Sequence, residues 1–343
     1  MSEIPRGHHY VWQYYLSSWC VNDKVWWNRK GTIQNTKTTK ILKKKDMYKI
    51  EKLNKLEKWI LDNLWMDDNR KQLKEIISNE MKMFDSLSLF EDKEPSYIIE
   101  KLVTDYGMVI SKDGIEIDYK DFIESFEGKE NSRENIIEEI KKNRIEQGEK
   151  LISEDENSGR RFLDMLRNDD ISFFDYSNND IFDFFIYLNS QYFRTIKMRD
   201  RIGKNVKSLV PELKKRLKTD LDADGKKIYS HGLHGFVLKI SIGVLQDKDY
   251  KIMMLKSKGM TFITSDQPVM NMDETLMEDG TPESLQYLMP ISPDRAIIIG
   301  KNVKQNSIVE VDDKTVEYLN GIIKANSYET IIGVDKKIVS PLI

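Results

Sequence analysis

The sequence contains few residues of the kinds that form disulfides or bind metals. It has one cysteine, Cys20, and four histidines in 343 residues. A single cysteine excludes an internal disulfide framework and a cysteine-based zinc module. Few histidines also mean few side chains that could act as a general base near neutral pH. We therefore expect a protein of a reducing compartment with a small set of titratable groups available for chemistry.

Long apolar runs are also missing. The sequence has no uninterrupted run of about 18 apolar residues, the length that a membrane-crossing helix needs. Its first residues, Met1 to Arg6, contain no apolar segment of the kind that directs secretion. We expect a cytoplasmic protein that does not contact a membrane.

Neither sign of charge dominates. Lys and Arg number 54 and Asp and Glu 57, which gives a net charge of −3. This balance excludes a uniformly basic nucleic-acid binder, so a nucleic-acid partner would need a local basic patch. A homo-oligomer or a partner protein is equally compatible with the composition. The hydrophobic fraction of 39% is enough for a sizeable core.

The order of patterns predicts an α+β protein that is mainly helical. Short β-type runs around Gly31 predict a hairpin, and we assign residues 1–46 to a small N-terminal β unit. Helical spacing of apolar residues from Met47 predicts a helical insertion over 47–170, with a second hairpin near 107–118.

Residues 171–343 are predicted to form core helices and a C-terminal mixed α/β sheet region that packs with residues 1–46 as one domain. Asn178 to Ile202 is expected to be one continuous buried helix because it is apolar around most of its circumference. Further helices are predicted from Glu212 and over 226–244. The later predictions are strands near 251–255, 260–264, 285–289, 296–299 and 329–332 and a helix over 316–325 capped by Asp312 or Asp313.

Common catalytic motifs are absent. The sequence has no P-loop, no dinucleotide-binding Gly-x-Gly-x-x-Gly after a strand, no Gly-x-Ser-x-Gly elbow and no His-Glu-x-x-His. These absences argue against P-loop nucleotide hydrolysis, dinucleotide redox chemistry, α/β-hydrolase chemistry and zincin chemistry.

Two patterns could bind a metal, and each has a simpler interpretation. His231 and His234 lie three residues apart on a predicted helix. They could bind a metal between their imidazoles, or they could be an incidental surface pair. Asp220, Asp222 and Asp224 have calcium-loop spacing, but His231 stands where the bidentate Glu belongs. A divalent metal is therefore left open, with no ligand assigned.

Arg194 and Arg199 lie in a segment that is otherwise apolar. A buried guanidinium needs a carboxylate or a phosphate-like ligand, so either a structural ion pair or anion binding is expected. The two arginines are five residues apart. On a continuous helix their side chains would therefore point in directions about 140° apart around the helix axis. Gln191, Arg194 and Arg201 would share one face.

Ser265 and Asp266 end an apolar strand at a turn before Pro268. Short polar residues at such a turn are common in catalytic sites and are equally common as turn caps. Asp266 is the better candidate for an acid, a base or a metal ligand, because Ser265 has no histidine near it in the sequence.

These scattered features together resemble a bacterial family of unknown function, DUF4238. The resemblance rests on the His9-Tyr10-Val11 start, the Gln191-x-x-Arg194-Thr195 centre with Arg199, and Phe-Ile-Thr-Ser-Asp-x-Pro-Val over 262–269. Trp12 and Ile196 stand where that family usually has proline, which restricts the backbone.

The resemblance brings no activity, but it singles out a set of residues. The residues expected to be catalytic are His9, Arg194, Arg199, Ser265 and Asp266, and those expected to bind are Gln13, Gln191 and Pro268. One imidazole, two guanidinium groups and a carboxylate suit phosphodiester cleavage. We expect a nuclease-like hydrolase, acting on RNA rather than DNA, as an effector in anti-phage defence or a toxin. The alternatives are a non-catalytic nucleotide- or anion-binding sensor or scaffold, and a purely structural polar core.

Overall fold

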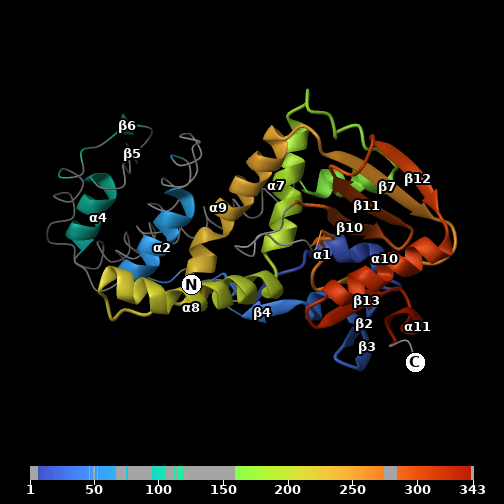
Figure 1. Ribbon diagram of the computed structural model, residues 1–343, viewed down its shortest axis with the longest axis horizontal. Helices are drawn as coiled ribbons and strands as arrows, with labels where there is room; N and C mark the ends of the chain where they lie inside the picture. Colours follow the sequence, from blue (N-terminus) through green and yellow to red (C-terminus); the bar gives the residue numbers. More distant parts are fainter. Residues whose placement is uncertain are drawn as a thin grey trace. The chain divides into compact units, whose positions relative to one another are not determined.

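The structure is a computed structural model that divides into two compact units. The first unit comprises residues 1–48, 155–205 and 233–343, and the second comprises 49–154 and 206–232 (Figure 1). The predicted insertion over 47–170 thus shares residues 49–154 with the second unit. The described residues are 7–45, 47–48, 51, 53–66, 75, 95–104, 111–112, 115–116, 118, 120, 159–273 and 284–340.

The larger sheet of the first unit has five strands. Their order is β12-β7-β11-β10-β9, and all neighbours are antiparallel except β12 and β7. The predicted strands near 251, 285 and 296 are confirmed, while β12 was not predicted. The strands are β7 (Lys251–Ser257), β9 (Met270–Asn271), β10 (Tyr287–Ser292), β11 (Arg295–Gly300) and β12 (Ser307–Val311).

This sheet is covered on both faces by helices of the first unit. Leu288 and Ile298 belong to one core cluster with Leu319 of α10 (Asp313–Asn326). On the opposite face the Tyr287 hydroxyl donates to Asn189 Oδ1 of α7 (Asp180–Phe193) at 2.8 Å. Burial on both faces explains why β10 and β11 read as continuous apolar runs instead of alternating ones.

A second sheet joins the two ends of the chain. Its order is β3-β2-β13-β8, so the N-terminal hairpin pairs with a strand from near the C-terminus. The hairpin prediction is confirmed. The strands are β2 (Lys24–Arg29), β3 (Thr32–Lys37), β8 (Thr264–Ser265) and β13 (Thr330–Gly333), and the short α11 (Lys336–Val339) follows β13.

One predicted strand is shorter in the structure than in the sequence analysis. Of residues 260–264, only Thr264 is in a strand. The preceding residues are held by single contacts, such as the N–H of Ile263 on Asn320 Oδ1 at 3.0 Å, instead of by a neighbouring strand.

The N-terminal segment contributes a small sheet and a short helix. Strand β1 (Gly7–His9) pairs antiparallel with β4 (Lys43–Lys45). Helix α1 (Gln13–Leu16) continues into a 3₁₀ turn over Ser17–Trp19, and a second such turn covers Thr38–Lys40. Trp19 Nε1 donates to the carbonyl of Phe262 at 2.9 Å, which fixes this helical turn on the segment that leads to β8.

The prediction of one continuous helix over 178–202 is wrong. The structure has α7 ending at Phe193 and α8 (Ile196–Leu217) beginning after a break at Arg194 and Thr195. The Thr195 hydroxyl explains the break, because it accepts the N–H of Met198 at 3.3 Å as a cap would. Helix α8 therefore starts 16 residues before the predicted start at Glu212, and the angle of 140° between the two arginines does not apply.

The described helices of the second unit are α2 (Lys55–Met66) and α4 (Pro95–Thr104). Helix α2 begins eight residues after Met47 because Asn54 Oδ1 accepts the N–H groups of Leu56 and Glu57 at its start. Strands β5 (Ser111–Lys112) and β6 (Ile115–Glu116) pair antiparallel, as predicted for a hairpin near 107–118. Residues 67–74, 76–94 and 121–158 of the helical insertion predicted over 47–170 lie outside the described residues.

Helix α9 (Gly225–Gln246) agrees with the prediction over 226–244. It is the one described helix whose length and composition would let it cross a membrane, and half of its most apolar window is buried within the protein. A core helix of the same length and composition would have these properties too, so this finding is weak evidence for a membrane span.

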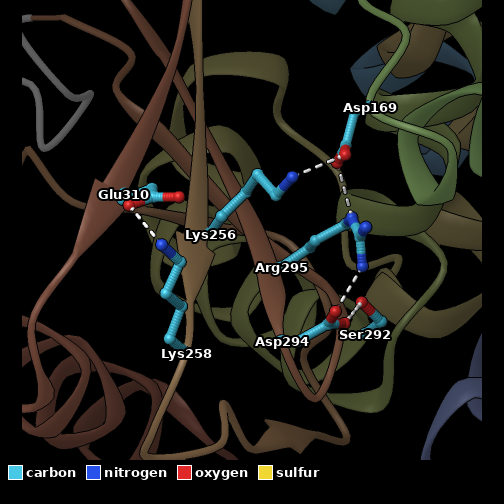
Figure 2. Close-up of polar contacts among 7 residues, drawn as sticks. All are labelled: Asp169, Lys256, Lys258, Ser292, Asp294, Arg295 and Glu310. Carbon is cyan, nitrogen blue, oxygen red and sulfur yellow. Dashed lines mark hydrogen bonds and ion pairs between the residues drawn. The ribbon is translucent and has the colours of Figure 1, made fainter.

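An ion-pair network fixes the turn after the helix over 159–167 to the larger sheet. Figure 2 shows the Asp169 carboxylate between Lys256 Nζ of β7, at 2.6 Å, and Arg295 Nε of β11, at 2.8 Å. Arg295 also pairs with Asp294, whose other oxygen accepts the Ser292 hydroxyl at 2.6 Å. The two cations lower the pKa of Asp169 to about 2.

This lowered pKa predicts a specific acid dependence of stability. In the unfolded chain the Asp169 pKa is about 4. The stabilising effect is therefore present above pH 4 and is lost as the pH falls toward 2. Asp169→Asn should lower the free energy of unfolding by about 1 kcal/mol at pH 7, because both ion pairs are partly exposed.

Urea unfolding at pH 7, 4 and 2.5 measures this effect. The difference between wild type and Asp169→Asn should shrink as the pH falls. Asp249→Asn removes an exposed carboxylate that has no ion pair among the described residues, and it should change stability by a few tenths of a kcal/mol at most. An equal loss in both variants would contradict the role of the network.

Candidate functional site

Asp266 holds together the turn after β8 and the segment before β13. Its Oδ1 accepts the N–H of Tyr328 at 2.8 Å, and its Oδ2 accepts the N–H groups of Glu329 at 2.8 Å and Thr330 at 2.9 Å. Burial raises the pKa of the Asp266 carboxyl, and the three N–H groups partly offset that rise. With both oxygens occupied by backbone, the carboxylate is placed to position this segment.

Ser265 and Gln267 complete the same turn. The Ser265 hydroxyl donates to the Gln267 carbonyl at 3.0 Å and accepts the N–H of Gln267 at 3.1 Å. The Gln267 side chain accepts the Thr195 hydroxyl at 2.6 Å and donates to the carbonyls of Tyr192 and Val269. The turn is therefore fixed to the break between α7 and α8, with Pro268 buried inside it.

Sequence reasoning missed Gln267. The family pattern treats this position as variable, so the motif did not select it. The available signal was a buried position, between Ser265 and Val269, occupied by an amide that must find partners once it is buried.

Arg194 lies at the C-cap of α7 and joins three segments. Its Nη2 donates to the carbonyl of His9 at 2.9 Å, and its own carbonyl accepts the Tyr48 hydroxyl at 2.7 Å. The Tyr48 ring in turn contacts the ring of His8, with centroids 5.5 Å apart. The structure thus brings Arg194 against the strand that carries both N-terminal histidines.

Gln191 faces the same N-terminal segment. Tyr187, Gln191 and Arg194 follow each other at four- and three-residue spacing, so they form one stripe along α7. The Tyr187 ring contacts the Trp12 ring, with centroids 6.0 Å apart, and Arg194 binds the carbonyl of His9. Gln191 between them therefore points toward residues 9–12, while Gln13, also of this segment, begins α1 and is partly exposed.

The amide oxygen of Gln191 is buried without a hydrogen-bond partner among the described residues. The residue is 1% exposed, and an unsatisfied buried acceptor costs about 1–3 kcal/mol. Such a cost in a native protein calls for an explanation, and a donor group on a ligand would supply one.

Arg199 lies apart from Arg194, on the first turns of α8. Its guanidinium pairs with Asp200 at 3.2 Å and donates to the sulfur of Met47 at 3.2 Å. The Tyr328 hydroxyl donates to the other oxygen of Asp200 at 2.8 Å. Asp200 thus balances the charge of Arg199 and connects α8 to the segment that Asp266 holds.

Tyr10 is a further buried group that sequence reasoning did not select. Burial and the nearby charges of Asp266 and Glu329 raise its pKa well above 10, and Arg29 acts in the opposite direction. Arg29 Nε donates to the Thr330 hydroxyl at 3.0 Å. Tyr10 follows His9 in the motif, so the residue type was visible but its proximity to Asp266 was not.

No group of three or more His, Cys, Asp or Glu side chains in the described part of the chain is arranged to bind a metal. His231 Nε2 hydrogen-bonds to the carbonyl of Glu51 at 2.8 Å. In the acidic loop, Asp222 pairs with Lys214 at 2.6 Å and Asp224 accepts the N–H of Lys226 at 2.8 Å. These contacts fit the interpretation of this loop as a structural turn between helices.

Apart from Arg199, which pairs with Asp200, the predicted residues fall into two groups. Ser265, Asp266 and Pro268 lie in the turn that Gln267 completes, and their polar atoms serve backbone contacts. Gln191 and Arg194 face the segment of His9 and Gln13. Only the second group offers a side-chain atom, the Gln191 oxygen, that is without a partner among the described residues.

Comparison with known protein families matches most of the chain. The model of the family described as a protein of unknown function, DUF4238, matches residues 7–337. No curated protein and no solved structure matches the chain. The match covers every element of the two groups above.

The contacts of Asp266 predict that it is needed for stability. Asp266→Asn should lower the free energy of unfolding by about 2–4 kcal/mol, because the amide leaves buried N–H groups without an acceptor. Thermal unfolding measures this, and Asp335→Asn, which replaces an exposed helix cap, is the control. An unchanged melting temperature with lost activity would instead favour an acid–base role for Asp266.

Gln191 should show the opposite behaviour. Gln191→Met keeps the side-chain length and removes the unsatisfied oxygen, so stability should stay the same or rise by about 1 kcal/mol. Asn189→Leu is the matched control on the same helix, because Asn189 binds Ser241 and Tyr287 and its loss should be destabilising. Urea unfolding of both variants compares them. A strong loss of stability in Gln191→Met would contradict this prediction and show that the amide makes a contact the fold needs.

Proposed function

We propose a function for this chain, which belongs to the protein family of unknown function DUF4238. The proposed function is that of a nuclease-like phosphodiester hydrolase with RNA as its substrate. The observation that carries the proposal is the register of the small N-terminal sheet. His9 pairs with Lys43 and His8 with Lys44, and Arg194 binds the His9 carbonyl. Imidazoles beside several cations are the groups that phosphodiester cleavage needs.

RNA fits this set because its own 2′-hydroxyl can act as the nucleophile. The His9 imidazole would take the proton of the 2′-hydroxyl while the 2′-oxygen attacks phosphorus. The bond from phosphorus to the 5′-oxygen breaks, and the leaving oxygen takes a proton from water. Lys43 and Arg194 would stabilise the charge on the phosphoryl oxygens during this step.

The other predicted residues support this arrangement from a distance. Asp266 and Ser265 are assigned as positioning residues, because their oxygens are used by the backbone of their own segments. Arg199 is paired with Asp200 and positions α8. Gln191 would accept a hydrogen bond from the substrate, through the oxygen that has no partner in the described structure.

A non-catalytic function is the second candidate. It is favoured by the contacts of Asp266, since the residue with the strongest family signal is used for structure. In that case the Gln191 and Arg194 face would bind a nucleotide or another anion and report its presence. The first proposal, by contrast, includes a biological setting: the nuclease would act in the cytoplasm as a defence effector or a toxin.

His9→Ala should abolish RNA cleavage and leave the melting temperature unchanged within about 2 °C. The reason is that His9 is partly exposed and lies in a small two-stranded sheet. The assay incubates purified protein with total RNA, transfer RNA and single- and double-stranded DNA, with Mg²⁺, Mn²⁺ or EDTA. His234→Ala is the matched control, since it removes an imidazole on α9.

Loss of cleavage in His9→Ala but not in His234→Ala is the expected result. Cleavage that survives in His9→Ala would overturn the proposed role of this residue. Wild-type protein that cleaves nothing but is stabilised by nucleotides would establish the sensor instead.

A further inference from the structure

Positive charge is concentrated in one short segment of the chain. Residues 24–45 contain eight basic side chains and no acidic one. The whole chain has 54 basic and 57 acidic residues, so the remainder has 46 and 57, a net charge of −11. A chain that is acidic elsewhere thus carries a strongly basic hairpin and strand.

These basic side chains lie on the surface of the first unit. They come from β2, β3, the 3₁₀ turn over Thr38–Lys40 and β4, drawn in blue in Figure 1. Arg29 and Lys44 are partly exposed, and six are exposed: Lys24, Lys30, Lys37, Lys40, Lys43 and Lys45. We call these eight residues the basic surface.

The basic surface has an energetic cost within the fold. Lys24 and Lys37 are direct partners across β2 and β3, and like charges in that position repel each other. A simpler explanation exists for lysine on the edge strand β3, where a charged side chain prevents the strand from pairing with another molecule. That explanation also covers the lysines of β4, which is an edge of its two-stranded sheet, but it does not reach Lys24 on the inner strand β2.

Aromatic rings accompany the lysines. Trp26 lies two residues from Lys24 on β2, so the two side chains share one face of the sheet. Its indole is partly exposed, and its cross-strand partner is the small polar Asn35. An exposed indole beside cations can stack on bases while the cations bind phosphates.

We propose that the basic surface binds single-stranded nucleic acid and leads it to the histidine strand. The route is set by the register, because β4 carries Lys43 and Lys44 directly opposite His9 and His8. This inference deepens the proposed function by naming the path of its substrate. Binding is measured separately from cleavage, so failure of one is distinguishable from failure of the other.

The test compares two triple variants that remove equal charge. Lys24→Gln, Lys37→Gln and Lys40→Gln neutralise the basic surface. Lys248→Gln, Lys304→Gln and Lys314→Gln neutralise three exposed lysines elsewhere in the first unit. Fluorescence anisotropy with a labelled 20-nucleotide RNA, the same sequence as DNA, and a duplex is recorded in EDTA over a series of salt concentrations.

The first triple variant should bind both single strands at least about tenfold more weakly at 100 mM salt. The slope of log affinity against log salt should decrease in magnitude by about 2, since each lost phosphate contact contributes about 0.7. The second triple variant should bind like wild type. Lys37→Gln alone should raise the melting temperature, because it removes the repulsion with Lys24.

Other outcomes would overturn the proposal. Equal weakening in both triple variants would show that net charge alone causes binding. Tighter binding of the duplex would contradict the stacking of bases on Trp26. Wild-type protein that binds vesicles of phosphatidylserine but no nucleic acid at 50 mM salt would assign the basic surface to a membrane. His9→Ala, by contrast, is expected to lose cleavage and keep affinity, because binding is assigned to the basic surface and not to His9.

Discussion

The arrangement of the first unit depends on one buried carboxylate. Asp266 accepts three consecutive backbone N–H groups at 2.8, 2.8 and 2.9 Å, and through them it sets where β13 begins. Strand β13 is the central link of the smaller sheet, because it pairs with β8 on one side and β2 on the other. The N-terminal hairpin therefore takes its position from a residue more than 200 positions later in the chain.

A second polar contact connects this turn to the helices. Gln267 binds the Thr195 hydroxyl at the break between α7 and α8, and Arg194 beside that break binds the His9 carbonyl. The turn, the break and the histidine strand thus form one chain of hydrogen bonds. Polar groups in such a chain are costly if any member is lost, which explains why the family pattern marks so many of them.

Much of the secondary structure was predictable because it depends on local patterns. The hairpin around Gly31, the helix after Asp312 and the strand over 296–299 follow from turn residues, a cap and an apolar run. The break at Thr195 was not predictable, since the apolar pattern continues through it and the Thr195 hydroxyl that caps α8 is held by Gln267, which is distant in sequence. The site residues were named by the family motif, but their roles required partners distant in sequence. The same holds for Asp169, whose partners Lys256 and Arg295 lie on two strands.

The pairing of β2 with β13 also constrains how the protein is made. During synthesis the hairpin emerges first, and its inner edge stays unpaired until residues 330–333 leave the ribosome. Contacts of this sequence separation form late and slowly. The nascent chain thus carries an incomplete sheet while the residues between β3 and β13 are synthesised. Any property that needs the complete sheet would therefore arise only after residues 330–333 have been synthesised.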